Sequence, residues 1–379
     1  MDFSLTKQEK LFLQMIREFA EKEVKPLAAE VDEQERFPLE TVGKMAKIGL
    51  MGIPVPKEYG GAGSTNQMYT MAVEELSRVC ATTGVIVSAH TSLCVAPIME
   101  HGTEEQKKKY LPKLASGEWL GAFALTEPNA GTDASAQQTI ATPDGDGYII
   151  NGSKIFITNA EYANVFIIFA MTDKSLGTKG ITAFILEKGM KGFSIGKKEL
   201  KMGIRGSATC ELIFEDVRVS KDQVLGKIGG GFGIAMKTLD GGRIGIASQA
   251  VGIAQGALDE TVKYTKERKQ FKRALAQFQN TQFQLADMKT KVEAARLLVR
   301  SAAYKKDQKQ PYSVDAAMAK LFAAETAMSV TTKAVQLHGG YGYTREYPVE
   351  RMMRDAKITE IYEGTSEVQR MVISANLLK

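Results

Sequence analysis

Three short segments of the sequence combine chemically capable side chains with glycines that leave the backbone accessible. The first, residues 123–133 (FALTEPNAGTD), follows an apolar run and is rich in small hydroxyl and amide residues. Such a segment can present backbone N–H groups and a threonine hydroxyl to a planar polar ring. A plain β-turn is the simpler explanation of the same composition, so both interpretations stay open.

The second segment, residues 338–343 (HGGYGY), directly follows a stretch with the apolar spacing of a helix. Its glycines would let the backbone approach a pyrophosphate closely. A helix C-cap followed by a turn explains the same residues at least as well. The pattern alone does not decide between a phosphate contact and a simple helix end.

The third segment, residues 361–366 (IYEGTS), places a carboxylate, Glu363, beside Gly364 and just before the expected last helix. The helix N-terminus would favour the ionised carboxylate, whereas an apolar cleft would remove water from it and raise its pKa. One acidic residue among the 44 of this chain is most simply a surface residue. The alternative is a general base that points into a cleft.

Several common cofactor and nucleophile motifs are missing from the sequence. No complete GxGxxG, GxxxxGK[ST] or GxSxG pattern occurs, which disfavours a Rossmann dinucleotide site, a P-loop and a hydrolase elbow. The cysteines Cys80, Cys94 and Cys210 form no CxxC pair, and the three histidines are scattered. We therefore expect neither a disulfide framework nor a metal site.

The composition is that of an ordinary globular protein. With 379 residues, 44% hydrophobic and 25% charged, the chain predicts two to three domains and argues against a disordered or fibrous protein. The net charge of +5 is small and spread out, which does not favour a nucleic-acid partner. The N-terminus has no signal-peptide pattern, and no stretch approaches the roughly 18–20 apolar residues of a membrane span. We expect a cytoplasmic protein without membrane insertion.

Hydrophobic periodicity divides the chain into three parts and predicts an α+β fold. Residues 1–120 show helical spacing and form an expected N-terminal helical domain. Residues 121–230 form an expected β domain, because short β-branched and aromatic runs follow one another without a helix between them. This succession predicts an antiparallel barrel or sandwich. Residues 231–379 return to long amphipathic helices, and we expect a C-terminal four-helix bundle.

Two local signals give finer expectations. Asn151-Gly152 lies between two strand-like runs and predicts a two-residue hairpin turn. Ser366-x-x-Gln369 has the pattern of a capping box and predicts the start of the last helix.

The three segments, in this order and in this helical–β–helical layout, resemble the acyl-CoA dehydrogenase family. The similarity covers essentially the whole chain and is greatest for the short-chain, butyryl-CoA dehydrogenase branch. Further stretches that carry it are 201–207 (KMGIRGS), 214–217 (FEDV), 267–271 (ERKQF), 351–356 (RMMRDA) and 361–370 (IYEGTSEVQR).

The resemblance implies FAD bound between the β domain and the C-terminal bundle. In the β domain the implied cofactor contacts are Phe123, Leu125, Thr126, Thr132, Phe156, Ile157 and Thr158. Many relatives carry tryptophan where this chain has Phe156, so the stacking surface is smaller here. For the pyrophosphate, the adenosine and the remainder of the site the implied residues are Arg268, Gln270, Gln279, Gln336, Gly340, Thr365 and Glu367. The first three of these would come from a neighbouring subunit.

Glu363 occupies the position of the family's catalytic base. Some branches place that glutamate on the helix that begins near Arg243, where this chain has Gly241 and Gly242, which cannot serve. The resemblance also implies contacts with the acyl-CoA substrate, made by Asp240, Gly242, Arg243, Thr132 and Gly364.

The implied reaction is α,β-dehydrogenation of a short-chain acyl-CoA, butyryl-CoA to crotonyl-CoA. Glu363 would take the α-proton, hydride would pass to flavin N5, and an electron-transfer flavoprotein would receive the electrons. A flavin site that bridges subunits implies a homotetramer, a dimer of dimers. Three alternatives stay open: an acyl-CoA oxidase, a flavin-binding assembly protein without turnover, and a family member for branched or aromatic acyl chains.

Overall fold

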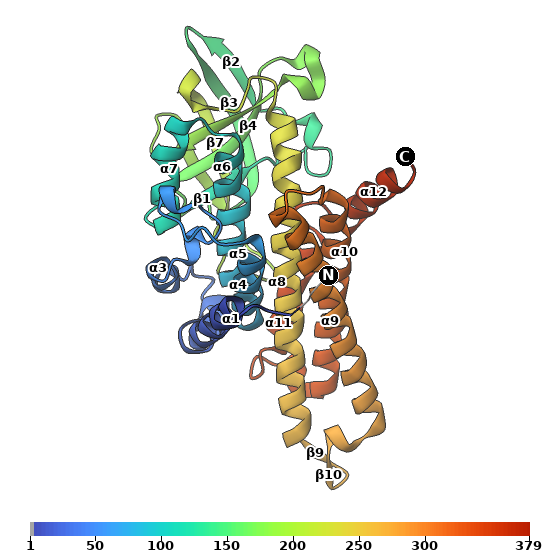
Figure 1. Ribbon diagram of the computed structural model, residues 1–379. Helices are drawn as coiled ribbons and strands as arrows, with labels where there is room; N and C mark the ends of the chain where they lie inside the picture. Colours follow the sequence, from blue (N-terminus) through green and yellow to red (C-terminus); the bar gives the residue numbers. More distant parts are fainter. Residues whose placement is uncertain (1–3) are drawn as a thin grey trace.

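The computed structural model describes residues 4–379 as a helical part, a β part and a second helical part (Figure 1). The N-terminal helices are α1 (Lys7–Phe19), α2 (Ala28–Glu33), α3 (Leu39–Lys47), α4 (Asn66–Val79), α5 (Ala81–Ser88), α6 (Ala96–His101) and α7 (Glu104–Ser116). Side-chain caps fix where these helices begin. The Thr6 hydroxyl accepts from the Glu9 N–H at 3.2 Å, and the Thr103 hydroxyl accepts from the Gln106 N–H at the same distance.

The β part is one open, mixed sheet. Its strands are β1 (Gly121–Ala124), β2 (Ile140–Asp144), β3 (Gly147–Thr158), β4 (Val165–Met171), β5 (Ile181–Glu187), β6 (Phe193–Lys198), β7 (Thr209–Ser220) and β8 (Val224–Leu225). The spatial order is β6-β7-β3-β2-β4-β5-β8, with β1 beside β4. The helical–β–helical layout is confirmed. The expected barrel closure is wrong, and the sheet is not wholly antiparallel, because β1 and β2 both pair with β4 in parallel.

The central strand β4 is buried on both faces. Phe166 and Ile168 pack into the core on one side of the sheet, whereas Val165, Ile167 and Phe169 pack into the core on the other side, toward the N-terminal helices. A strand covered on both faces reads as a continuous apolar run, which is why its sequence shows no alternation.

The hairpin expected at Asn151-Gly152 is wrong, because both residues lie inside β3. The turn falls earlier, where Asp144 of β2 pairs with Gly147 of β3. Gly152 instead marks an irregularity in the pairing of β3 with β7 and has a φ of 141°. A Cβ at this position would lie 2.8 Å from Thr139 Cα, so glycine is required by close approach of the backbone rather than by a turn.

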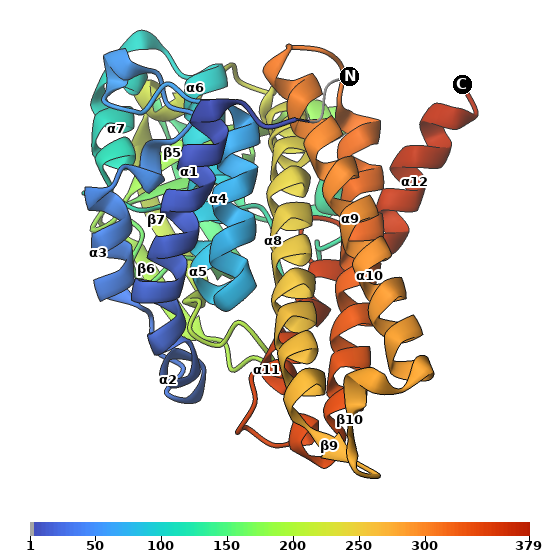
Figure 2. The same ribbon diagram turned by 60° about the horizontal axis from the view of Figure 1, so that its bottom comes forward.

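The C-terminal part is built around α8 (Gly231–Glu267), which is 37 residues long. It lies beside α9 (Gln279–Asp307) and α10 (Ser313–His338), and two short helices, α11 (Val349–Lys357) and α12 (Ser366–Leu377), complete the part (Figure 2). The two-residue strands β9 (Lys269–Gln270) and β10 (Arg273–Ala274) form a hairpin after α8.

Small residues let α8 pack closely against α4. A Cβ at Gly252 would lie 2.3 Å from the carbonyl oxygen of Glu74, and a Cβ at Gly256 would lie 2.0 Å from that of Arg78. Any side chain at either position would push the two helices apart. Gly252 and Gly256, which would weaken an isolated helix, are thus explained by this crossing.

One helical stretch in the described residues, Ala81–His101, is long and apolar enough to cross a membrane, contrary to the expectation that no such stretch exists. It comprises α5, the π-helical segment η5 (Ala89–Val95) and α6. Of its most apolar window, 89% is buried inside the protein. By length and composition alone it is weak evidence for a membrane span, and its position is that of a central core helix.

A fully buried lysine holds the loop that follows β1. Lys154 Nζ donates to Glu127 Oε1 at 2.7 Å, to Leu125 O at 3.1 Å and to Gln137 Oε1 at 3.1 Å. Glu127 in turn accepts from the backbone N–H groups of Gln138 and Thr139. The ion pair therefore joins both ends of the loop to β3.

Removing one partner of this pair leaves a buried charge without its counter-ion. Lys154→Met is expected to lower the free energy of unfolding by about 3–5 kcal/mol, measured by urea denaturation. Lys109→Met is the matched control, because Lys109 pairs with Glu187 at 2.6 Å on the surface and such exposed pairs contribute about 1 kcal/mol or less. Equal losses in the two variants would contradict the role given to Lys154.

Candidate active site

A cavity of about 190 Å³ lies where the three parts of the chain meet. The residues expected from the sequence that line it are Phe123, Leu125, Thr126, Thr132, Phe156, Ile157, Thr158, Arg243, Glu363 and Gly364. They come from β1 and its following loop, the end of β3, α8, and the turn before α12. We call this cavity the Glu363 cleft.

The opposite wall of the Glu363 cleft is apolar and was not expected from the sequence. Val85, Ala89 and Leu93 line it from α5 and η5, and Met236 and Leu239 line it from α8. The π-helical segment η5 interrupts the regular helix here, a feature often found at functional sites. No motif in the sequence marks this wall, because its residues have the composition of any buried helix.

Glu363 lies in the turn between the 3-10 helix η11 (Ile358–Glu360) and α12. Its φ is 55° and that of Gly364 is 94°, so two successive residues adopt left-handed backbone. For a non-glycine residue this conformation costs about 1–2 kcal/mol, and such outliers cluster at functional sites.

The Glu363 carboxyl group is buried, and its Oε2 has no hydrogen-bond partner among the described residues. Burial raises its pKa from 4.5 to about 7, although the positive charges of Lys320 and Arg243 act in the opposite direction. Removal of water, one of the two effects that the sequence suggested, therefore determines the direction of the pKa shift.

The capping box expected at Ser366-x-x-Gln369 is wrong by one residue. The N-cap of α12 is Thr365, whose hydroxyl accepts from the Val368 N–H at 3.3 Å. The Gln369 amide instead donates to the carbonyl oxygen of Gly364 at 2.8 Å and to that of Glu363 at 3.4 Å. Gln369 thus binds the turn that carries Glu363 and leaves the capping to Thr365.

Gly242 provides the space that the Glu363 carboxyl group occupies. A Cβ at Gly242 would lie 2.0 Å from Glu363 Oε2 and 2.8 Å from Leu93 Cδ2. Nearby, Arg243 Nη1 donates to Asp240 Oδ1 at 2.6 Å, while the buried Arg243 Nε has no partner among residues 4–379. Gly242 and Arg243 therefore lie beside Glu363, and Asp240 is held next to them through its ion pair with Arg243.

The rim of the Glu363 cleft includes a strained, exposed aromatic residue. Phe156 has a φ of 60° and its side chain is 58% exposed, although it lies in the sheet. A ring held open to solvent by left-handed backbone is available to stack against a planar ligand.

A second cavity, of about 490 Å³, brings together four other expected residues: Arg268, Gln270, Gln336 and Gly340. Arg268 caps the end of α8, whereas Arg243 of the same helix lines the Glu363 cleft. The two residues are 25 positions apart, which is a distance of roughly 37 Å along the helix axis at 1.5 Å per residue. The chain therefore does not bring the two groups of expected cofactor residues together within one subunit.

The remaining expected residues lie near these two cavities but do not line them. Gln279 begins α9, just beyond the β9–β10 hairpin. Thr365 caps α12, and Glu367 lies in its first turn, with its side chain exposed.

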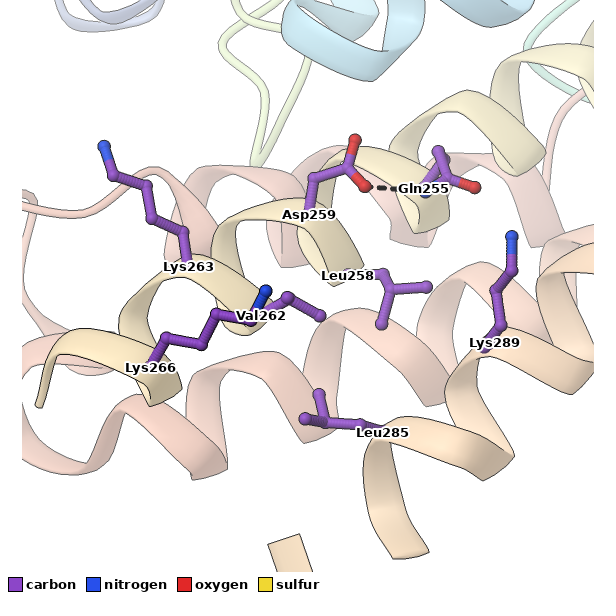
Figure 3. A pocket seen from close by; sticks show the side chains of 8 residues that line it. All are labelled: Gln255, Leu258, Asp259, Val262, Lys263, Lys266, Leu285 and Lys289. Atoms are coloured by element: carbon purple, nitrogen blue, oxygen red, sulfur yellow. Dashed lines mark hydrogen bonds between the residues drawn. The ribbon is translucent and has the colours of Figure 1, made fainter. Parts of the chain in front are cut away.

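A third cavity, of about 520 Å³, lies between α8 and α9 (Figure 3). Lys263, Lys266 and Lys289 surround an apolar floor, and Gln255 donates a hydrogen bond to Asp259. None of the residues expected to act in binding or catalysis lines it. Its size alone does not make it a site.

Comparison with known proteins gives consistent matches along the whole chain. Three domain families match: "Acyl-CoA dehydrogenase, N-terminal domain" over residues 6–118, "Acyl-CoA dehydrogenase, middle domain" over 122–217 and "Acyl-CoA dehydrogenase, C-terminal domain" over 229–378. The chain is 66% identical to "Acyl-CoA dehydrogenase, short-chain specific" of Clostridium acetobutylicum, and the match covers all of both chains.

Two solved structures are also similar over the full length of both chains. The first, described as "Electron transferring flavoprotein of Acidaminococcus fermentans: Towards a mechanism of flavin-based electron bifurcation", superimposes with a TM-score of 0.99 at 58% identity. The second is butyryl-CoA dehydrogenase from Megasphaera elsdenii, with a TM-score of 0.98 at 54% identity.

The raised pKa of Glu363 predicts a pH-dependent stability. The unfolded chain loses this proton near pH 4.5 and the folded protein near pH 7, so Glu363 destabilises the folded state increasingly as the pH rises between these values. Glu363→Gln removes the effect. Its free energy of unfolding, relative to the parent, is expected to be about 2–3 kcal/mol higher at pH 8 than at pH 5.

Urea denaturation of both proteins at the two pH values measures this difference. Glu325→Gln, which removes a carboxylate from the surface of α10, is the control. A stability difference between Glu363→Gln and the parent that does not change with pH would show that the buried carboxyl group is not the cause.

Proposed function

The chain belongs to the acyl-CoA dehydrogenase family, and on this premise we propose that Glu363 is the base that removes the α-proton of a short-chain acyl-CoA. The supporting observation is the carboxyl group itself, which is buried, lacks a partner at Oε2 and lines a cavity bounded by apolar side chains. Family membership makes the protein an acyl-CoA dehydrogenase.

The Glu363 cleft suits a flavin. Leu125 and Ile157 offer apolar surface, and the hydroxyl groups of Thr126 and Thr158 have no hydrogen-bond partner within residues 4–379. Apolar faces with free donors at the edge match an isoalloxazine ring, which is flat and has a polar rim. When bound there, FAD supplies the two-electron oxidant of the reaction.

The chain's own groups perform the proton chemistry. A base with a pKa near the working pH combines a useful fraction of ionised carboxylate with enough basicity to remove a proton, and Glu363 has this property. Its backbone N–H has no acceptor among the described residues. It is thus free to donate to the thioester oxygen, where one preorganised donor contributes about 3–4 kcal/mol.

The apolar wall excludes water and limits the substrate. Val85, Ala89 and Leu93 line the cleft with apolar side chains that cannot form hydrogen bonds to water, and this keeps the Glu363 carboxyl group desolvated. The name of the relative from Clostridium acetobutylicum supports a short acyl chain.

The pyrophosphate and adenosine end of the cofactor would be bound by Arg268, Gln270, Gln279, Gln336 and Gly340. Within one chain this group lies roughly 37 Å along α8 from the Glu363 cleft. Because Gln336 and Gly340 line the same cavity as Arg268 and Gln270, we propose that a neighbouring subunit supplies these four residues together with Gln279, in a homotetramer. Thr365 and Glu367 would complete the site next to Gly364.

The proposed electron acceptor is an electron-transfer flavoprotein. The similar structure from Acidaminococcus fermentans is described by that name, which supports this choice. A cytoplasmic location is part of the same proposal, since the one membrane-length helix of the described residues lies in the core.

Glu363→Gln tests the base directly. The variant is expected to keep its bound flavin and its yellow colour but to slow the bleaching of the flavin by butyryl-CoA about 10²–10⁴-fold, because the proton has no acceptor. Anaerobic stopped-flow absorbance measures the rate. Glu360→Gln, which removes a carboxylate three residues earlier that pairs with Lys357, is the control. Bleaching at the parental rate in Glu363→Gln would remove Glu363 from the mechanism.

Arg268→Ala tests the distant half of the cofactor site. Its planar guanidinium group can donate twice to a diphosphate, so its loss is expected to weaken the retention of FAD. The flavin-to-protein ratio after dialysis measures this. Lys266→Ala removes a cation two residues away, in the third cavity, and serves as the control. The assignment fails if both variants retain FAD equally.

A further inference from the structure

A second fully buried lysine lies next to the Glu363 turn. Lys320 on α10 has no exposed surface, a property it shares with Lys154. The two differ in their partners. Lys154 contacts the Glu127 carboxylate at 2.7 Å, whereas Lys320 has no carboxylate within 4.0 Å among the described residues.

The only hydrogen-bond acceptor of Lys320 within residues 4–379 is the carbonyl oxygen of Gly364, at 2.7 Å. That oxygen also accepts from Gln369 Nε2 at 2.8 Å. Two donors from two different helices, α10 and α12, therefore meet on the peptide group that follows Glu363 and Gly364. This peptide lies at the end of the left-handed turn, so its two hydrogen bonds hold the turn that carries Glu363.

A buried ammonium without an ion-pair partner is costly and needs an explanation. A neutral side chain that fills the same space would hold α10 in the core without this cost. The position of Lys320 behind the Glu363 turn supplies the explanation, because its charge acts on the one buried carboxyl group nearby that also lacks a partner.

We propose that Lys320 is a positioning residue for the base: its ammonium group fixes the Gly364 carbonyl and keeps a positive charge beside the Glu363 carboxylate. This inference rests on the proposed function of Glu363. Lys320 does not contact the substrate in this proposal and acts through the turn.

None of the other charged and titratable groups named around Glu363 supplies an unpaired positive charge, as Lys320 does. From α8, Arg243 also attracts the carboxylate, but its charge is shared with Asp240 at 2.6 Å. From α4 and the turn itself, Tyr69 and Tyr362 are neutral phenols whose pKa values are raised by burial. Burial lowers the pKa of Lys320 to about 8, so it remains mainly charged at neutral pH.

The test is the pH dependence of flavin bleaching by butyryl-CoA in the FAD-loaded enzyme, compared among variants. Removing the positive charge raises the pKa of Glu363, so the rise of the rate with pH moves to higher pH. We call the pH range over which the rate rises the acidic limb of the pH–rate profile. Lys320→Met is expected to move this limb to a pH about one unit higher, so the rate at a fixed pH on the limb is tenfold lower. Lys320→Arg, which keeps the charge, is expected to retain the parental limb.

Two further variants separate the charge from the hydrogen bond. Gln369→Leu removes the other donor to Gly364 without changing the charge and is expected to lower the rate while leaving the limb in place. Lys333→Met removes an exposed lysine from the same helix and is expected to change neither. If Lys320→Met fails to fold, Lys320→Gln removes the charge, keeps a donor and is expected to show the same shift.

A parental limb in Lys320→Met or Lys320→Gln would overturn the proposal, because a merely structural lysine lowers stability without moving the limb. Parental bleaching in Glu363→Gln would instead overturn the assignment of the base, and the role of Lys320 with it. The two failures are therefore distinguished by measuring Glu363→Gln in the same series.

Discussion

The central constraint on this structure is a carboxyl group that is removed from water and has no hydrogen-bonded partner at Oε2. The Glu363 carboxyl group is buried, its Oε2 lacks a hydrogen-bond partner in the described chain, and its pKa is raised to about 7. Such an arrangement destabilises the folded state, and the surrounding fold must hold it in place. All three parts of the chain meet at this group, and the left-handed backbone at Glu363 and Gly364 adds further strain that the packing must offset.

The helices around the turn provide that packing in complementary ways. Gly242 on α8 leaves room for the carboxyl group, and Lys320 on α10 and Gln369 on α12 bind the carbonyl that follows it. The buried Lys154–Glu127 pair plays a similar structural part across the cleft, where it holds the loop after β1. The two fully buried lysines of the described residues, Lys154 and Lys320, thus both bind backbone segments without regular structure.

Much of this could be predicted from the sequence where the signal is local or carried by a motif. The capping boxes at Thr6 and Thr103 follow from short motifs, and the three-part layout follows from the hydrophobic periodicity. The meeting of Phe123, Thr126 and Glu363 in one cleft was implied only by the family resemblance. The sheet order could not be predicted, because the parallel pairing of β1 with β4 joins strands far apart in the sequence. Gly152 misled the hairpin prediction, since glycine serves a close backbone approach as readily as a turn. Lys320 gives no signal at all, as one lysine on an alanine-rich helix looks like a surface residue.

The length of α8 has a genetic consequence. If each subunit contributes Arg268 to the site of a neighbour and Glu363 to its own site, then a chain with a substitution at one of these positions still has a functional residue at the other. Two inactive proteins, one altered at the base and one altered at the distal arginine, would regain part of their activity when co-expressed, because some mixed assemblies would contain a site built from the two unaltered halves. In the proposed arrangement, the length of α8 would make the working unit of this enzyme a pair of chains rather than one.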